Sequence, residues 1–183
     1  AQTPAQRREE LPLTAPPRIA LTRRWWARTL AVNAALLLAF SAAIQVIPVP
    51  RENPPVQREP QWDSPQTRDL AAAACFDCHS NETAWPWYAR VAPFAWVVWY
   101  DVTEGREALN FSEWERHVRD ESVDPGDPFP PKTLSERITD AIRDGSMPPG
   151  TYRLAHPAAR LSGAEKEALI EGLVRTVQAS QDR

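Results

Sequence analysis

Apolar positions divide the chain into one continuous apolar run and a series of shorter segments with helical spacing. Eighteen residues from Leu30 to Ile47 are nearly all apolar, with Asn33 and Gln45 as the main polar exceptions. As a helix this run is about 27 Å long, close to the roughly 30 Å of a bilayer's hydrocarbon core. Beyond residue 64 no alternating strand pattern stands out. The pattern therefore predicts an all-α protein with a transmembrane helix at residues 25–48.

Helix-start signals divide the rest of the chain. Ser64 followed by Pro65 predicts an N-cap and a first turn, and this helix runs through Ala71–Ala74. An aromatic-rich second helix is expected at Phe94–Leu109. The capping-box pattern is a serine or threonine followed three residues later by glutamate, and it predicts three more helix starts. These are Ser112-x-x-Glu115, Thr133-x-x-Glu136 and Ser162-x-x-Glu165.

The last two predicted helices carry apolar faces, and the segments around them carry turn signals. The faces are Ile138, Ala141 and Ile142 in one helix, and Leu169, Ile170, Leu173, Val174 and Val177 in the other. Gly145 is expected to end the first of these helices. The proline-rich segment Asp124–Pro131 is expected to be a loop.

Basic residues precede the apolar run and set the expected orientation. Arg18, Arg23, Arg24 and Arg28 lie before or at its start, so the positive-inside rule places residues 1–24 in the cytoplasm and the rest outside. Trp25 and Trp26 suit the membrane interface. A cleaved signal peptide and a buried soluble helix are the alternatives, and the length and basic flank of the run favour an uncleaved single-pass anchor in the cytoplasmic membrane.

A proline-rich segment follows the anchor at residues 49–63. Its prolines predict a stiff, extended spacer that would hold the remaining domain, residues 64–183, roughly 40 Å above the bilayer. Residues 1–50 carry a net charge of +4 and residues 51–183 a net charge of −7. The acidic balance gives no support for nucleic-acid binding, which needs a basic face. It would attract a basic partner, such as a soluble redox protein.

The segment Cys75-Phe76-Asp77-Cys78-His79 has the C-x-x-C-H pattern of covalent haem c attachment. Two thiols at this spacing add to the two vinyl groups of haem, and the next residue, His79, is the expected proximal iron ligand. A redox dithiol and half of a zinc site are the alternatives. A four-cysteine zinc site is impossible, because the chain has two cysteines, and no strand-rich pattern precedes Cys75 as a thioredoxin-like motif would require.

Met147 is the expected distal iron ligand. It is the one methionine of the chain and lies on the proline-bounded segment Gly145–Gly150, well downstream of His79. A thioether ligand favours Fe(II), and flanking prolines restrict the loop that carries it. His117 and His156 are the competing sixth ligands.

Four stretches resemble the membrane-anchored monohaem c-type cytochromes of the haem-binding domain family. They are WDSPQTRDLAAAAC (62–75), CFDCHSNETAWPWYARVAPFAW (75–96), EGREALNFSEW (104–114) and GSMPPGTYRLAHPAARLS (145–162). The resemblance runs from about Pro48 to the C-terminus. It implies one covalent haem c held by Cys75 and Cys78, with His79 proximal and Met147 distal, in a cytochrome c-like helical domain.

Two functions follow as expectations. With both axial positions filled, the chain would carry single electrons and catalyse no substrate turnover of its own. It would either exchange electrons with a soluble partner that docks on it, or act as a fixed subunit of a respiratory or photosynthetic membrane complex. A mainly structural haem-containing accessory subunit, or a haem sensor, is the alternative.

Overall fold

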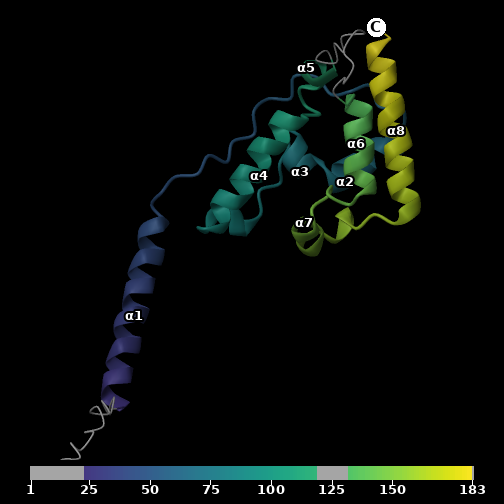
Figure 1. The fold of residues 1–183 in the computed structure, drawn as a ribbon. Helices are drawn as coiled ribbons and strands as arrows, with labels where there is room; N and C mark the ends of the chain where they lie inside the picture. The colour runs from purple at the N-terminus through teal and green to yellow at the C-terminus, as the bar shows by residue number, and fades with distance from the viewer. Residues whose placement is uncertain (1–22, 119–131, 183) are drawn as a thin grey trace, which may run out of the picture. The chain divides into compact units, whose positions relative to one another are not determined.

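The computed structural model describes residues 23–118 and 132–182, and the regular secondary structure of these residues is helical (Figure 1). Their one β-type pairing is an isolated bridge between Arg58 and Glu113. The predicted all-α class is therefore confirmed. The chain divides into two units, one up to Ala43 and one from Ile44 onward, and each is described by itself.

The first unit is built on α1, Arg23–Ile44. Its length and composition would allow it to cross a membrane, and none of its residues is buried. The Asn33 side chain donates to the carbonyl of Thr29, one turn earlier in the same helix, at 2.8 Å. The helix ends before the predicted boundary at residue 48. Gln45, the next residue, has its side chain hydrogen-bonded to the backbone of Ala92 instead.

The second unit consists of short helices followed by one long one. They are α2 Pro65–Ala74, α3 Phe76–His79, η2 Trp87–Arg90, α4 Phe94–Ala108, α5 Trp114–Val118, α6 Leu134–Arg143, α7 Gly150–Ala155, η3 Pro157–Ala159 and α8 Gly163–Gln181. The helices expected at residues 64–74, 94–109, 133–144 and 162–177 are present. The short elements α7 and η3 were not expected. The predicted loop Asp124–Pro131 lies outside the described residues.

Helix caps explain most of these boundaries. Ser64 accepts a hydrogen bond from the amide of Thr67, with Pro65 in the first turn. Thr133 with Glu136, and Ser162 with Glu165, form the two complete capping boxes expected at those positions. Gly145 has φ of 79°, a left-handed conformation that suits glycine just after a helix end.

The third predicted capping box is wrong. The short helix α5 begins at Trp114, so Ser112 does not occupy its N-cap position. The Ser112 hydroxyl accepts a hydrogen bond from the amide of Asn81 at 2.9 Å. Because this tertiary partner occupies the hydroxyl, the segment closes onto the loop after α3.

The core lies where α2 and α6 pack against α8 (Figure 1). Gly172 of α8 permits the contact with α2, because a Cβ there would lie 2.1 Å from Oγ1 of Thr67. The first helix of the domain, α2, thus packs against the last, α8. The buried apolar residues of the core include Ile138, Ile142, Leu169, Leu173 and Val177.

The predicted spacer covers residues 49–63, and between Asn53 and Arg58 it does not stand free of the domain, because it is hydrogen-bonded to it there. The amides of Gln57 and Arg58 both donate to the carbonyl of Ser112, at 2.9 and 3.0 Å. The Asn53 side chain donates to the carbonyl of Thr83 at 2.9 Å. These hydrogen bonds hold the proline-rich segment along the surface of the domain, because its backbone groups find acceptors and donors there.

Candidate haem site

The C-x-x-C-H segment forms the corner between α2 and α3. Cys75 ends α2, and its amide donates to the carbonyl of Ala71 at 2.8 Å. Phe76, the first residue between the cysteines, is buried among Trp62 and Phe111, with ring centroids 6.1 and 5.5 Å away. This aromatic anchor holds the corner against the core, so that the cysteine and histidine side chains are positioned by a rigid backbone.

The His79 ring is oriented by a backbone carbonyl. Its Nδ1 lies 3.0 Å from the carbonyl oxygen of Leu109. A carbonyl can only accept, so Nδ1 carries the proton and Nε2 presents a lone pair. Burial also lowers the pKa of His79, which keeps the ring neutral at neutral pH. A neutral imidazole with Nδ1–H bound to a carbonyl is the form that ligates a metal through Nε2.

The two thiols are half-buried, free and protonated. Burial raises the pKa of Cys75 to about 12, and burial with the nearby Asp101 carboxylate raises the pKa of Cys78 to about 11. A redox dithiol needs the opposite, a lowered pKa that supplies thiolate. The described residues also bring together no group of three or more His, Cys, Asp or Glu side chains that could hold a metal ion. The raised thiol pKa values and the lack of such a group among the described residues weigh against the redox-dithiol and zinc alternatives.

Helix α4 packs closely against the motif at Gly105. A Cβ on Gly105 would lie 2.5 Å from the carbonyl oxygen and 3.0 Å from the Cβ of Cys78. No larger residue fits without moving one of the two backbones. The same helix leads into Leu109, so this close contact sets the position of the carbonyl that orients His79.

Arg106 joins the loop after the motif to the proline-rich segment. Its guanidinium donates to the carbonyl of Ser80 at 2.8 Å, to Oγ1 of Thr83 at 2.9 Å and to Oδ1 of Asn53 at 2.9 Å. A further hydrogen bond of 3.1 Å reaches the carbonyl of Glu52. Burial lowers the pKa of Arg106, although the group remains a cation at all ordinary pH values. The polar residues that follow His79 therefore serve to brace the site.

Met147 lies on the loop between α6 and α7 and is partly exposed, at 38%. Its amide donates to the carbonyl of Ala141 at 2.9 Å, which fixes the loop to the end of α6. Five residues later, the hydroxyl of Tyr152 donates to Oδ2 of Asp77 at 2.7 Å. The fold therefore attaches the helix that follows Met147 to Asp77, one of the two residues between the cysteines.

The two competing histidines have different surroundings. His117 is buried on α5, and its Nε2 has no hydrogen-bond partner in the structure described. Burial lowers the pKa of His117, and the positive charge of Arg116 lowers it further. His156 stacks on Tyr152 with ring centroids 3.9 Å apart, and its Nδ1 donates to the Tyr152 carbonyl at 3.0 Å. Its Nε2 lies 3.8 Å from Oδ2 of Asp77.

Four residues of the site were not anticipated from the sequence. They are Gly105, Arg106, Leu109 and Tyr152. Leu109 acts through a carbonyl that every residue possesses, so no side-chain signal marks it. Gly105 and Tyr152 carry weak signals, as a glycine inside a helical pattern and as a tyrosine close behind the methionine loop.

Two thiols, a histidine with an available Nε2 and a rigid helical corner fit a haem group attached through the motif. The class defined by this fold and site is a small helical haem-binding domain. A family model described as the haem-binding domain matches residues 39–175, and the chain belongs to this family. No curated protein and no solved structure matches the chain significantly.

Proposed function

We propose that the chain is a monohaem c-type cytochrome, anchored in the cytoplasmic membrane by α1, that carries single electrons on the outer side. It would act as a subunit of a respiratory or photosynthetic electron-transfer complex. Cys75 and Cys78 would hold the haem covalently, His79 would ligate iron on the proximal side and Met147 on the distal side. When bound, haem c supplies a one-electron Fe(II)/Fe(III) couple.

The observation that carries this proposal is the hydrogen bond from Nδ1 of His79 to the carbonyl of Leu109. It fixes the tautomer, holds the ring plane and leaves Nε2 as the ligating atom, directly after two free thiols. The family membership supports the same cofactor.

Electron transfer, rather than substrate chemistry, is supported by the ligand set. His79 and Met147 would both ligate the iron, and a haem held by two protein ligands would supply one-electron chemistry. The described residues near the motif serve in bracing: Arg106 binds backbone and hydroxyl oxygens, and Asp77 accepts from Tyr152 and from the amide of Ala84.

The anchor and the charge support the proposed location and partners. The α1 helix is long and apolar enough to cross a bilayer, and arginines precede it. This orientation would place the domain outside the cytoplasm. The net charge of −7 on residues 51–183 would attract a basic soluble redox protein.

Covalent attachment and stoichiometry can be tested on the chain purified from native membranes. The pyridine haemochrome spectrum should report one haem per chain, and the haem should stay with the polypeptide on a denaturing gel. Cys75→Ser combined with Cys78→Ser should abolish the covalent stain. A wild-type chain that loses all its haem on denaturation would refute the c-type assignment, although not the family.

Carbon monoxide separates the carrier from the sensor. A carrier with both axial ligands in place should not bind carbon monoxide at neutral pH, whereas a sensor with a displaceable ligand should bind it.

The salt dependence of reduction then separates two modes of transfer. A soluble basic partner should react more slowly as salt screens charges beyond about 10 Å, and transfer within a fixed complex should be largely insensitive.

A further inference from the structure

We propose that residues next to the end of α1 form a surface that binds the headgroups of anionic phospholipids and holds the haem-bearing unit against the bilayer. This inference rests on the membrane anchor of the proposed function. We name this the junction surface. It consists of Gln45, Ile47, Val49, Arg51, Trp87, Arg90, Val91, Ala92 and Phe94.

Covalent continuity places the junction surface beside the point where the anchor ends. Gln45 directly follows the last residue of α1 and belongs to the second unit. Its Nε2 donates to the carbonyl of Ala92 at 3.2 Å, and its Oε1 accepts from the amide of Ala92 at 3.0 Å. Ala92 therefore lies within one side-chain length of the residue that follows the anchor. This holds whatever direction α1 takes.

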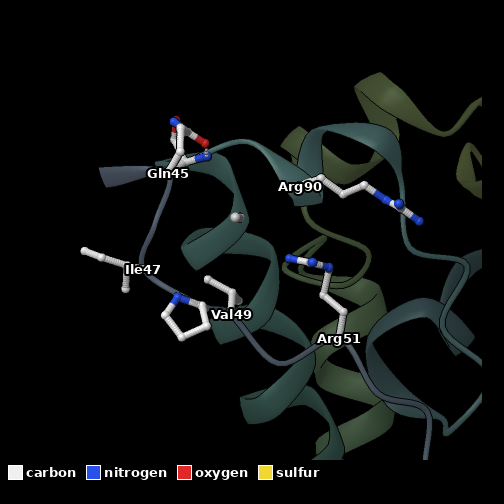
Figure 2. Close-up of a pocket in the computed structure, with 8 residues that line it drawn as sticks. Gln45, Ile47, Val49, Arg51 and Arg90 are labelled. Carbon is white, nitrogen blue, oxygen red and sulfur yellow. Dashed lines mark hydrogen bonds between the residues drawn. The ribbon is translucent and has the colours of Figure 1, made fainter. Parts of the chain in front are cut away.

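The junction surface surrounds a small pocket of about 160 Å³ with two arginines and no carboxylate in its lining (Figure 2). Arg51 reaches up toward the turn of η2, where it donates to the carbonyl of Ala89 at 3.4 Å, and Arg90 extends outward from that turn. Among the described residues, neither arginine has an ion-pair partner. The lining of the pocket is therefore cationic, and this charge favours an anionic ligand.

Exposed apolar side chains accompany the two arginines. Trp87 is 76% exposed and Phe94 59%, and Ile47 and Val91 are also exposed. Val91 and Phe94 alternate along the chain with the pocket residues Arg90, Ala92 and Ala95. Tryptophan, aliphatic residues and arginine together are typical of the bilayer interface, where rings sit at headgroup level and cations meet phosphates.

The bilayer is the occupant that position favours. A protein partner could also cover apolar residues, but it would have to reach a surface that begins one residue beyond the anchor. Lipid headgroups are already there. Binding to them would hold the second unit close to the membrane, in agreement with the binding of the proline-rich segment to the domain through Asn53, Gln57 and Arg58.

Hydrogen exchange of the full-length haem-loaded chain in nanodiscs tests this inference. Two lipid compositions are compared, phosphatidylcholine alone and phosphatidylcholine with phosphatidylglycerol. Amides in residues 87–95 should exchange at least about threefold more slowly in the anionic discs, since each basic residue adds to the attraction. Arg90→Glu should remove this difference, because Arg90 is exposed and its replacement does not disturb the fold. Val91→Ser with Phe94→Ser should raise exchange in both disc types.

Arg137→Glu is the matched control, because Arg137 is an exposed arginine of α6 far from Gln45 in sequence, and it should leave the lipid difference intact. Equal exchange of residues 87–95 in both discs would overturn the inference. So would a Phe94→Ser variant that alters the haem absorption spectrum while keeping the wild-type lipid difference, because Phe94 would then cover the haem. A chain that fails to enter discs at all would refute the anchor, and this outcome is distinct from an inserted chain without protection.

Discussion

The hydroxyl of Tyr152 donates a 2.7 Å hydrogen bond to Oδ2 of Asp77, and this contact joins two segments that are 75 positions apart. Asp77 lies between the two cysteines, and Tyr152 lies on α7, just after the loop that carries Met147. Burial and the Asp77 carboxylate both raise the pKa of Tyr152, so its hydroxyl stays protonated and donates throughout the working pH range. The C-x-x-C-H segment and the helix that follows the Met147 loop are therefore coupled through this hydrogen bond.

Replacing Tyr152 with phenylalanine should loosen this coupling. Loss of a half-buried hydrogen bond to a charged acceptor should lower the free energy of unfolding by about 1–2 kcal/mol. The reduction potential of the haem should shift as well, because the Met147 loop would be held less firmly. Chemical denaturation and redox titration measure the two effects. Tyr100→Phe is the control, since Tyr100 is exposed and should change neither.

Gly105→Ala should be among the most damaging single substitutions outside the motif. The new Cβ would lie 2.5 Å from the Cys78 carbonyl, so α4 would have to move away from the motif. Overpacking of this kind costs about 1–3 kcal/mol, and the moved Leu109 carbonyl would orient His79 less well. Thermal unfolding and the yield of haem-loaded protein should both fall.

Gly163→Ala provides the comparison for that substitution. A Cβ at Gly163 meets nothing within 4 Å, so alanine should be neutral or slightly stabilising there. If Gly105→Ala were as well tolerated as Gly163→Ala, the close packing of α4 on the motif would be wrong.

Local signals in the sequence predicted the parts of the fold that local physics determines. Ser64, Thr133 and Ser162 cap helices because each hydroxyl accepts a hydrogen bond from an amide three residues ahead in the chain. Ser112 has the same local pattern but a different outcome. Its hydroxyl accepts from Asn81, a partner 31 positions away that no short pattern specifies.

Residue type and spacing select the candidate side chains of the site, but the groups that position them could not be predicted from the sequence. Cys75, Cys78 and His79 are marked by residue type and spacing. The groups that position them are the carbonyl of Leu109 and the close backbone contact at Gly105. Backbone atoms and absent side chains leave little trace in a single sequence. For the same reason, the sequence does not predict that the amides of Gln57 and Arg58 donate to the carbonyl of Ser112.

Met147→Ala should identify the distal ligand. The wild-type oxidised protein should show the near-infrared magnetic circular dichroism of His/Met ligation, and the variant should lose it. The reduction potential should fall, because loss of the thioether removes a ligand that favours Fe(II). His117→Gln and His156→Gln should each keep the signal. A persistent sulfur signature in Met147→Ala, or the loss of low-spin ligation in either histidine variant, would assign the distal position differently.

His117 should make the stability of the protein depend on pH in a defined window. Burial holds the pKa of its folded-state imidazole below the ordinary value of 6.5. Between these two pKa values the unfolded chain binds a proton that the folded chain does not, so the stabilising contribution is fully present above pH 6.5 and is lost as the pH falls through the folded-state pKa. One such group changes the free energy of unfolding by at most about 1.4 kcal/mol per pH unit. In His117→Gln the decline between pH 7 and pH 5 should be shallower than in the wild type. Urea titrations of the haem-loaded wild type and of His117→Gln at several pH values measure the free energy of unfolding. If the two proteins lose stability in parallel as the pH falls, His117 has the same pKa in the folded and unfolded states.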